Sequence, residues 1–182
     1  MKKILMSKLW ILFLAILTSM ILASACTTES LPLGKPAKGE TLIVTIDQLE
    51  RAPEIRYHGT DGRHYLVSPE SLSNEFVVLK MNVHNAEATV VQMTVEGDAV
   101  KLRGFGHDEE YQIAEVRPRD YSNVTIVDTV HPAENIFVPF IIGPLELPQG
   151  HSLIGWIAFE VPIGLDLREI RWGAGDIVFL RS

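Results

Sequence analysis

The side chains of this chain that could carry out chemistry are a serine among glycines, six histidines and a run of acidic residues. Ser152 lies between Gly150 and Gly155, a spacing one residue longer than that of the Gly-x-Ser-x-Gly turn of α/β-hydrolases. That turn must follow a strand and open a helix, whereas this segment follows a proline-containing loop and opens an apolar run. We therefore predict that Ser152 is a strand-edge residue and not a nucleophile.

Two of the histidines, His58 and His64, lie on either side of Asp61-Gly62, a dipeptide typical of a two-residue hairpin turn. In that register His58 pairs with Tyr65 and His64 pairs with Gly59, so the two imidazoles would point to opposite faces. A shift of one residue would change this arrangement. The sequence therefore predicts no shared metal site on the hairpin. Three other histidines have no partner at strand or helical spacing: His84, His131 and His151.

An acidic segment offers four neighbouring side chains that could bind a cation: His107, Asp108, Glu109 and Glu110. Oxygen ligands suit a hard cation such as Ca²⁺. The carboxylates lack the regular spacing of a calcium loop, however, so a solvated acidic turn is the preferred interpretation. These four residues are kept as candidate contacts for a ligand or partner.

Four aromatic residues at strand spacing could line a ligand groove, but we expect most of them to fill a core. They are Trp156, Phe159, Trp172 and Phe179. Trp172 is the expected exception and a candidate partner contact, because the charged Arg171 and a glycine flank it. No phosphate loop, dinucleotide fingerprint or nucleophile–base arrangement is found, so neither a cofactor nor catalytic activity is expected.

The N-terminal segment has the three parts of a secretory signal peptide. Lysines open it, residues 9–22 are almost wholly apolar, and small residues precede the only cysteine, Cys26. A cysteine directly after Leu-Ala-Ser-Ala resembles the lipobox of bacterial lipoproteins, although Ala23 stands where leucine is commoner. The resemblance implies that residues 1–25 are removed and that the Cys26 thiol receives the lipid that anchors the chain.

An uncleaved transmembrane anchor is the alternative interpretation of this leader. Residues 9–25 reach only the lower edge of the roughly 17–25 residues that span a bilayer. Both interpretations place the rest of the chain on the extracytoplasmic side of a cell membrane. With Cys26 acylated, the mature protein has no thiol for a disulfide or a metal, so its core alone must hold the fold.

The charge of the mature protein limits its partners. The chain has 16 basic and 23 acidic residues, and removal of the three leader lysines leaves 13 against 23, a net charge of −10. This balance argues against nucleic acid, whose phosphates select basic surfaces. It also argues against a domain that lies flat on anionic lipid. We therefore expect the partner to be another envelope protein or a polymer.

The remaining chain divides into a tether and one domain. Residues 26–40 are polar, contain prolines and glycines, and are predicted to form a lipid-anchored flexible linker. Residues 41–182 consist of short β-branched runs broken by turn residues, which predicts an all-β, antiparallel sandwich. The clearest alternation lies in residues 75–85, where one face is wholly apolar and the other turns from apolar to polar along the strand.

Two segments resemble secreted bacterial immunoglobulin-like domains of unknown function, which lipoproteins often carry. The first is the strand of residues 75–85, which ends in Asn85. The second is a loop that begins Leu-Pro and leads into a strand with Gly155-Trp156 and a terminal Val-Pro. Its loop reads Pro-Gln-Gly, whereas Pro-Gly followed by an acidic residue is commoner. The resemblance implies an immunoglobulin-like β-sandwich, similar to that of an exported mycobacterial antigen, and it carries no catalytic residue.

Together these patterns favour a lipid-anchored extracytoplasmic binding or scaffolding module that is not an enzyme. The first alternative is an envelope lipoprotein that binds a metal or a small ligand through residues 107–110 or the hairpin histidines. The second is an envelope hydrolase, which the sequence favours less because it lacks a nucleophile–base arrangement.

Overall fold

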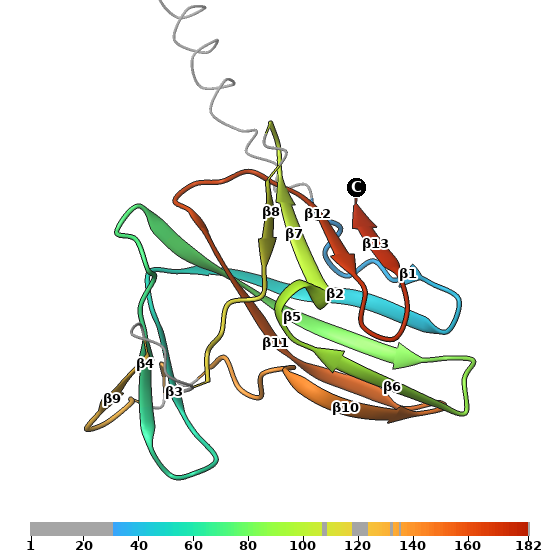
Figure 1. Cartoon of the computed structure of the whole chain (residues 1–182), viewed down its shortest axis with the longest axis horizontal. Coiled ribbons are helices and arrows are strands. Elements are labelled where there is room, and N and C mark those ends of the chain that lie inside the picture. The colour runs from blue at the N-terminus through green and yellow to red at the C-terminus, as the bar shows by residue number, and fades with distance from the viewer. Residues whose placement is uncertain (1–30, 107–108, 118–123, 132, 135, 182) are drawn as a thin grey trace, which may run out of the picture.

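The computed structural model describes residues 31–106, 109–117, 124–131, 133–134 and 136–181 (Figure 1). Within these residues the regular elements are β-strands, apart from a 3₁₀ turn at Gly97–Ala99. All named strand pairs are antiparallel, so the predicted all-β antiparallel sandwich is confirmed. No helix in this part of the chain is long and apolar enough to cross a membrane.

Four groups of strands build the molecule. The long sheet has the order β1 (Ala37–Lys38), β2 (Leu42–Ala52), β5 (Asn74–Asn85) and β11 (Ser152–Pro162). The covering sheet has the order β13 (Val178–Arg181), β12 (Leu167–Trp172), β7 (Val100–Gly104) and β8 (Glu110–Gln112). The ribbon pairs β6 (Val90–Val95) with β10 (Gly143–Pro148). The hairpin sheet has the order β3 (Ile55–His58), β4 (His64–Val67) and β9 (Val124–Val127).

The main core lies between the long sheet on one side and the covering sheet and ribbon on the other. Strand β5 shows why the sequence folds this way, since its alternating apolar residues point into this core, as predicted. They are Val77, Leu79, Met81 and Val83, all fully buried. The residues on the opposite face of the same half of the strand, Lys80, Asn82 and His84, are half-buried.

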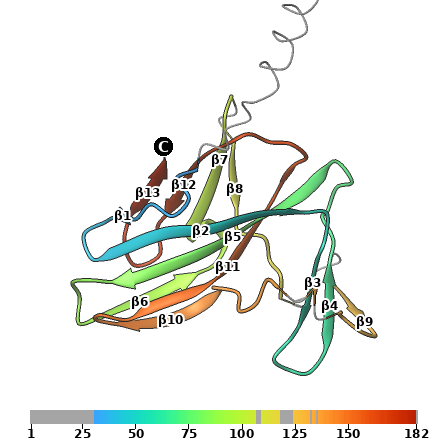
Figure 2. The same cartoon turned by 180° about the vertical axis from the view of Figure 1, so that it is seen from behind.

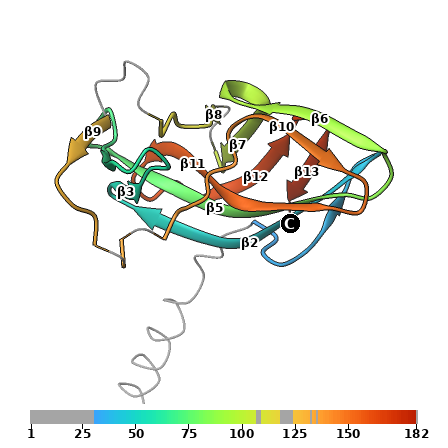
Figure 3. The same ribbon diagram turned by 90° about the horizontal axis from the view of Figure 1, so that it is seen from below.

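A second core lies on the opposite face of the long sheet, at the end where β5 begins. Phe76 and Val78 of β5 point into it and are fully buried, as are Ile55 and Val67 of the hairpin sheet. The long sheet is therefore covered on both faces at this end. Figure 3 shows the hairpin sheet at one end of the long sheet and the ribbon at the other.

The predicted linker is shorter than expected. Leu31 is only 5% exposed and belongs to the main core, and residues Ala37–Lys38 form β1. Gly34 donates its backbone N–H to the Ile46 carbonyl at 2.8 Å. The prediction of a flexible tether is therefore wrong for residues 31–40, because an isolated apolar residue of this polar segment, Leu31, is buried in the main core. Residues 26–30 lie outside the described part of the chain.

Two positions in the segments that resemble immunoglobulin-like domains have clear structural roles. Asn85 is fully buried, and its amide donates to the carbonyls of Ala88 and Leu147 at 2.7 and 2.8 Å. Gly155 lets another segment approach, since a Cβ there would lie 2.6 Å from the Pro139 carbonyl oxygen. The finer prediction, an immunoglobulin-like order of strands, stays a prediction.

Candidate functional site

The loop between β3 and β4 is longer than the sequence predicts. It covers residues 59–63, so His58 pairs directly with His64 and Tyr57 pairs directly with Tyr65. The prediction of a two-residue turn is wrong because Asp61 bonds across the loop. Its carboxylate accepts the Tyr65 hydroxyl at 2.6 Å and the backbone N–H of Arg63 at 3.1 Å.

This register brings the two hairpin histidines together. The rings of His58 and His64 have centres 4.5 Å apart and are tilted by 41°. The prediction that they point to opposite faces is therefore wrong. His64 Nδ1 is buried and has no hydrogen-bond partner among the described residues. The two imidazoles are placed so that one small ligand could contact both.

The other face of the hairpin carries its two tyrosines. Tyr57 and Tyr65 stack with ring centres 5.1 Å apart, and Phe140 meets Tyr57 edge-on at 5.3 Å. The Tyr57 hydroxyl donates to the Val116 carbonyl at 2.5 Å. Burial raises the pKa of Tyr57 far above its usual value. The phenol therefore stays a neutral hydrogen-bond donor.

The hydrogen bond between Tyr65 and Asp61 polarises this pair of side chains. It raises the pKa of the Tyr65 phenol and lowers the pKa of the Asp61 carboxyl. The backbone N–H of Arg63 lowers the pKa of Asp61 further. Asp61 is thus held as an anion within the β3–β4 loop.

An open hollow of about 800 Å³, called here the hairpin groove, lies between the hairpin sheet and residues 138–142. Its apolar wall is formed by the tyrosines together with Val138, Pro139, Phe140 and Ile142. Asp61 and Arg117 contribute charges of opposite sign to its lining. The other lining residues are His58, Gly59 and Thr60.

Arg117 is held in place by two acidic residues. Its guanidinium lies 3.2 Å from a carboxylate oxygen of Glu96 and 3.5 Å from one of Glu115. A Cβ added to Gly143 would lie 3.3 Å from the same guanidinium, so this glycine gives the arginine room beside the groove. The sequence does not reveal the setting of this cation, because Glu96 and Gly143 are distant from it along the chain.

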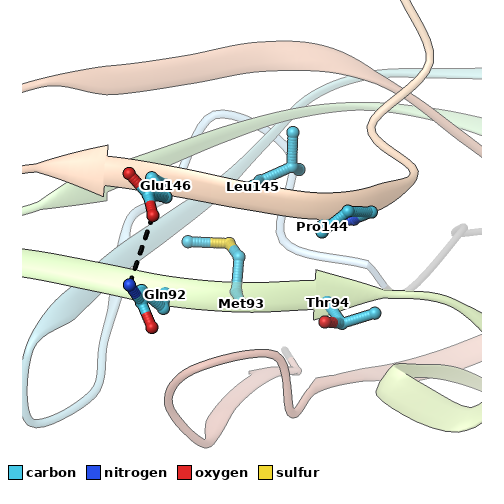
Figure 4. Close-up of a pocket in the computed structure, with 6 residues that line it drawn as sticks. All are labelled: Gln92, Met93, Thr94, Pro144, Leu145 and Glu146. Atoms are coloured by element: carbon cyan, nitrogen blue, oxygen red, sulfur yellow. Dashed lines mark hydrogen bonds between the residues drawn. The ribbon is translucent and has the colours of Figure 1, made fainter.

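A second hollow, of about 480 Å³, lies on the ribbon (Figure 4). Gln92 donates from its side-chain amide to Glu146 at 3.2 Å across the two strands. Glu146 is the only ionisable residue in its lining, which also contains Met93, Thr94, Pro144 and Leu145. This hollow therefore offers fewer charged and aromatic groups for selecting a ligand than the hairpin groove does.

Trp172 does not lie at the surface. Its side chain is fully buried in the main core, and its indole N–H donates to the Ala174 carbonyl at 2.8 Å. The prediction of a partner contact at Trp172 is therefore wrong. Neighbouring residues of a strand point to opposite faces. The charge of Arg171 therefore describes the outer face of β12 and says nothing about the face that carries Trp172.

The acidic segment is only partly described, since His107 and Asp108 lie outside the described residues. Glu110 forms ion pairs with Lys101, at 2.8 Å, and with Arg103, and both cations lower its pKa. Glu109 accepts the Tyr111 hydroxyl at 3.2 Å. In the described part of the chain, no group of three or more His, Cys, Asp or Glu is placed to hold a metal.

Ser152 is the first residue of β11 and is exposed, so the prediction of a strand-edge position is confirmed. Its Oγ lies 3.0 Å from Nδ1 of His84, the residue directly opposite on β5. The prediction that His84 has no partner is therefore wrong, because the sequence does not show that β5 pairs with β11. Neither residue lines the hairpin groove or the hollow on the ribbon.

Comparisons with protein-family models, with curated proteins and with solved structures find no match to this chain.

Proposed function

We propose that this chain is a lipid-anchored, extracytoplasmic binding module of the bacterial cell envelope that is not an enzyme. Its anchor is the acylated Cys26, and its partner is a segment of another envelope protein or polymer held in the hairpin groove. The observation that carries the proposal is the groove itself, which combines an aromatic wall with charges of opposite sign at Asp61 and Arg117.

The shape and chemistry of the groove support binding. Its volume of about 800 Å³ lies within the range of roughly 300–1,000 Å³ that is typical of ligand sites. Tyrosine and phenylalanine provide large contact areas at low cost in side-chain entropy. The charges of Asp61 and Arg117 would orient a polar segment on the apolar wall.

The same groups have little freedom for acid–base catalysis. The Tyr57 hydroxyl is bonded to a backbone carbonyl, Asp61 is held as an anion by Tyr65, and Arg117 faces two carboxylates. A general acid or base needs a pKa near the working pH. The pKa of Tyr57 is raised and that of Asp61 is lowered, so both move away from that range.

A capture experiment from native membranes tests the binding function. Thr60→Trp fills the hairpin groove at an exposed lining residue, and Thr94→Trp makes the matched change in the hollow on the ribbon. We expect native protein and the Thr94 variant to recover the same partner, and the Thr60 variant to lose it while melting at the same temperature. Equal recovery by both variants would assign the partner to another surface.

The anchor needs its own test. Intact-mass analysis of the protein purified from native membranes should give a chain that begins at Cys26 and carries the added mass of fatty chains. An unprocessed start, or an unmodified thiol at Cys26, would contradict the anchor and leave the binding groove to be judged by the capture experiment alone.

A second candidate function is the binding of a transition-metal ion by His58 and His64. Two imidazoles on one cation, with metal–nitrogen bonds of about 2.1 Å, have ring centres about 4.6–5.3 Å apart at bond angles of about 90–109°. The observed separation of 4.5 Å lies next to the lower limit, so a small rotation of the rings would admit an ion with a bond angle near about 90°. Water or a partner's side chain would complete the coordination.

Calorimetric titration with Ni²⁺ and Zn²⁺ tests this second candidate. His64→Ala should abolish binding, whereas His151→Ala, which changes an exposed histidine elsewhere, should leave it unchanged. Binding that survives in the His64 variant would place the ion elsewhere.

A further inference from the structure

The outer face of the covering sheet gathers basic side chains. Alternation along β7, β12 and β13 turns Leu102, Ile170 and Leu180 into the main core, where all three are fully buried. It turns the opposite set of residues outward, and this set includes four cations: Lys101, Arg103, Arg171 and Arg181. The register shift in β12 adds Arg168, which is exposed next to this face.

Glu169 is more deeply buried on this face than the cations beside it. Glu169 lies 3.8 Å from both Arg103 and Arg181, and its side chain is 11% exposed against 46% and 71% for the two arginines. Glu110 is paired with Lys101 and Arg103. Both cations beside Glu169, and Arg103 beside Glu110, are more exposed than the carboxylates that they flank, so the most exposed charges of these pairs are positive.

The described part of this face therefore has a net positive charge in an otherwise acidic protein. Its five cations outnumber its four described acidic residues, Glu110 and Glu169 on the face and Glu109 and Asp166 at its border. The net charge of −10 expected for the mature protein is an average over the whole molecule. It does not describe this sheet.

Exposed apolar side chains accompany the cations. Phe179 pairs with Arg171 across β12 and β13 and is 47% exposed, and Phe105, which follows β7, is 49% exposed. Ile177 precedes β13 and is 55% exposed. Basic residues with aromatic and aliphatic neighbours are typical of surfaces that rest on a membrane, where cations meet lipid phosphates and apolar side chains enter the headgroup layer.

The position of the chain's start brings this face close to the anchor. Leu31 is seated in the main core, and β1 contacts β13 of the covering sheet. Four residues lie between Cys26 and Leu31, so the five steps from one Cα atom to the other span at most about 18 Å even in a fully extended chain. An acylated Cys26 would hold the domain within that distance of the bilayer. Figures 1 and 2 show the covering sheet and β1 on the side of the molecule away from the hairpin sheet.

We propose that the outer face of the covering sheet docks on anionic phospholipid headgroups and thereby orients the anchored domain. The hairpin groove then faces away from the bilayer, toward the partner. This proposal rests on the lipid anchor of the proposed function. The expected ligand is anionic lipid because of the charge of the face and its short distance from the anchor.

A single fluorescent label on native, acylated protein tests the docked face. Acylation of Cys26 leaves the chain without another thiol, so Gln112→Cys on β8 provides a unique attachment point on the docking face. Thr94→Cys on the ribbon is the matched control. The labelled proteins are bound to vesicles of phosphatidylcholine, alone or with one third phosphatidylglycerol, both containing lipids with a quencher on the headgroup.

We expect the label at position 112 to be quenched on anionic vesicles and to recover at high salt, while the label at position 94 stays unquenched. Arg171→Gln with Arg181→Gln should lower the ratio of docked to undocked protein by about 30-fold, since each basic residue near an anionic surface contributes about fivefold. The control pair Arg56→Gln with Arg63→Gln, on the hairpin, makes the same change in net charge and should have no effect.

The outcomes separate the two proposals. Protein that sediments with both kinds of vesicle but shows no quenching at position 112 would overturn the docking face and leave the anchor intact. Protein that sediments with neither would overturn both. A change in the emission of the label at position 112 on addition of a soluble polyanion, but not on addition of anionic vesicles, would assign the face to an acidic polymer and overturn docking on lipid.

Discussion

His58 and His64 lie directly opposite each other across the β3–β4 hairpin, with 4.5 Å between their ring centres. Gly59 donates its backbone N–H to Arg63, so the histidine pair occupies the next, non-hydrogen-bonded position, where side chains come closest. The five-residue loop thus decides whether the two imidazoles can act together.

A designed disulfide tests this register. Directly opposed residues in a non-hydrogen-bonded pair have Cα atoms about 4.5 Å apart, within the range that a disulfide can bridge. We expect His58→Cys with His64→Cys to oxidise readily, which intact-mass analysis would show as a loss of about 2 Da. His58→Cys with Leu66→Cys is the control and should stay reduced, because Leu66 pairs with Arg56. Oxidation of the control pair, but not of the first pair, would show that His58 does not lie opposite His64.

The bond between Tyr65 and Asp61 makes a prediction about pH. It lowers the pKa of Asp61, so Tyr65→Phe should raise that pKa toward its usual value. A depressed carboxyl pKa contributes stability that is present above the unfolded-state pKa and is lost as the pH falls through the folded-state pKa. The variant should therefore lose less stability on acidification. Titration of the Asp61 side-chain carbon by NMR measures the shift, and Glu110 should titrate unchanged.

The hairpin shows where reasoning from sequence stops. Glycine at position 62, with a φ of +80°, is in the turn as expected, and the alternation of β5 correctly predicts both of its faces. The loop length is set instead by a hydrogen bond between side chains, Asp61 and Tyr65, which no local pattern reveals. A shift of one residue in the pairing then reverses the relation of the two imidazoles.

The groove and the docking face were missed for a related reason. The groove joins the hairpin to Arg117 and residues 138–142, segments that are distant in sequence. The basic face was hidden because the total charge of the chain is negative and its cations come from three separate strands. Trp172 was misplaced because its charged neighbour belongs to the opposite face of β12.

Asp176 joins the loop before β13 to the start of β2, and this contact should make stability depend on pH. Its Oδ2 accepts the backbone N–H groups of Thr41 and Leu42 at 2.8 and 2.9 Å. Burial alone would raise the Asp176 pKa, but these bonds outweigh burial and lower it. The stabilisation is therefore present above the usual carboxyl pKa and is lost as the pH falls through the depressed value.

Asp176→Asn should reduce the free energy of unfolding by about 1–2 kcal/mol at neutral pH and by less in acid, because the lost bonds are charge-assisted. Urea unfolding of both proteins at neutral and acidic pH measures the difference. Asp47→Asn, at an exposed position on β2, is the matched control and should change little. A difference that does not depend on pH would show that the charge of Asp176 is not what matters.

Asn85 provides the sharpest test of the link between β5 and β10. Its amide donates to the carbonyls of Ala88 and Leu147, and its Oδ1 accepts the Ala88 N–H at 3.0 Å. Asn85→Ala leaves these backbone groups without partners at a site where Leu147 is buried and Ala88 is half-buried, so we expect a loss of about 2–4 kcal/mol in the free energy of unfolding. Asn82→Ala is the matched control on the same strand. The Oδ1 of Asn82 is buried without a partner, so its removal should cost less than about 1 kcal/mol. Equal losses in denaturant unfolding would mean that the contact at Asn85 adds nothing beyond the burial of an amide.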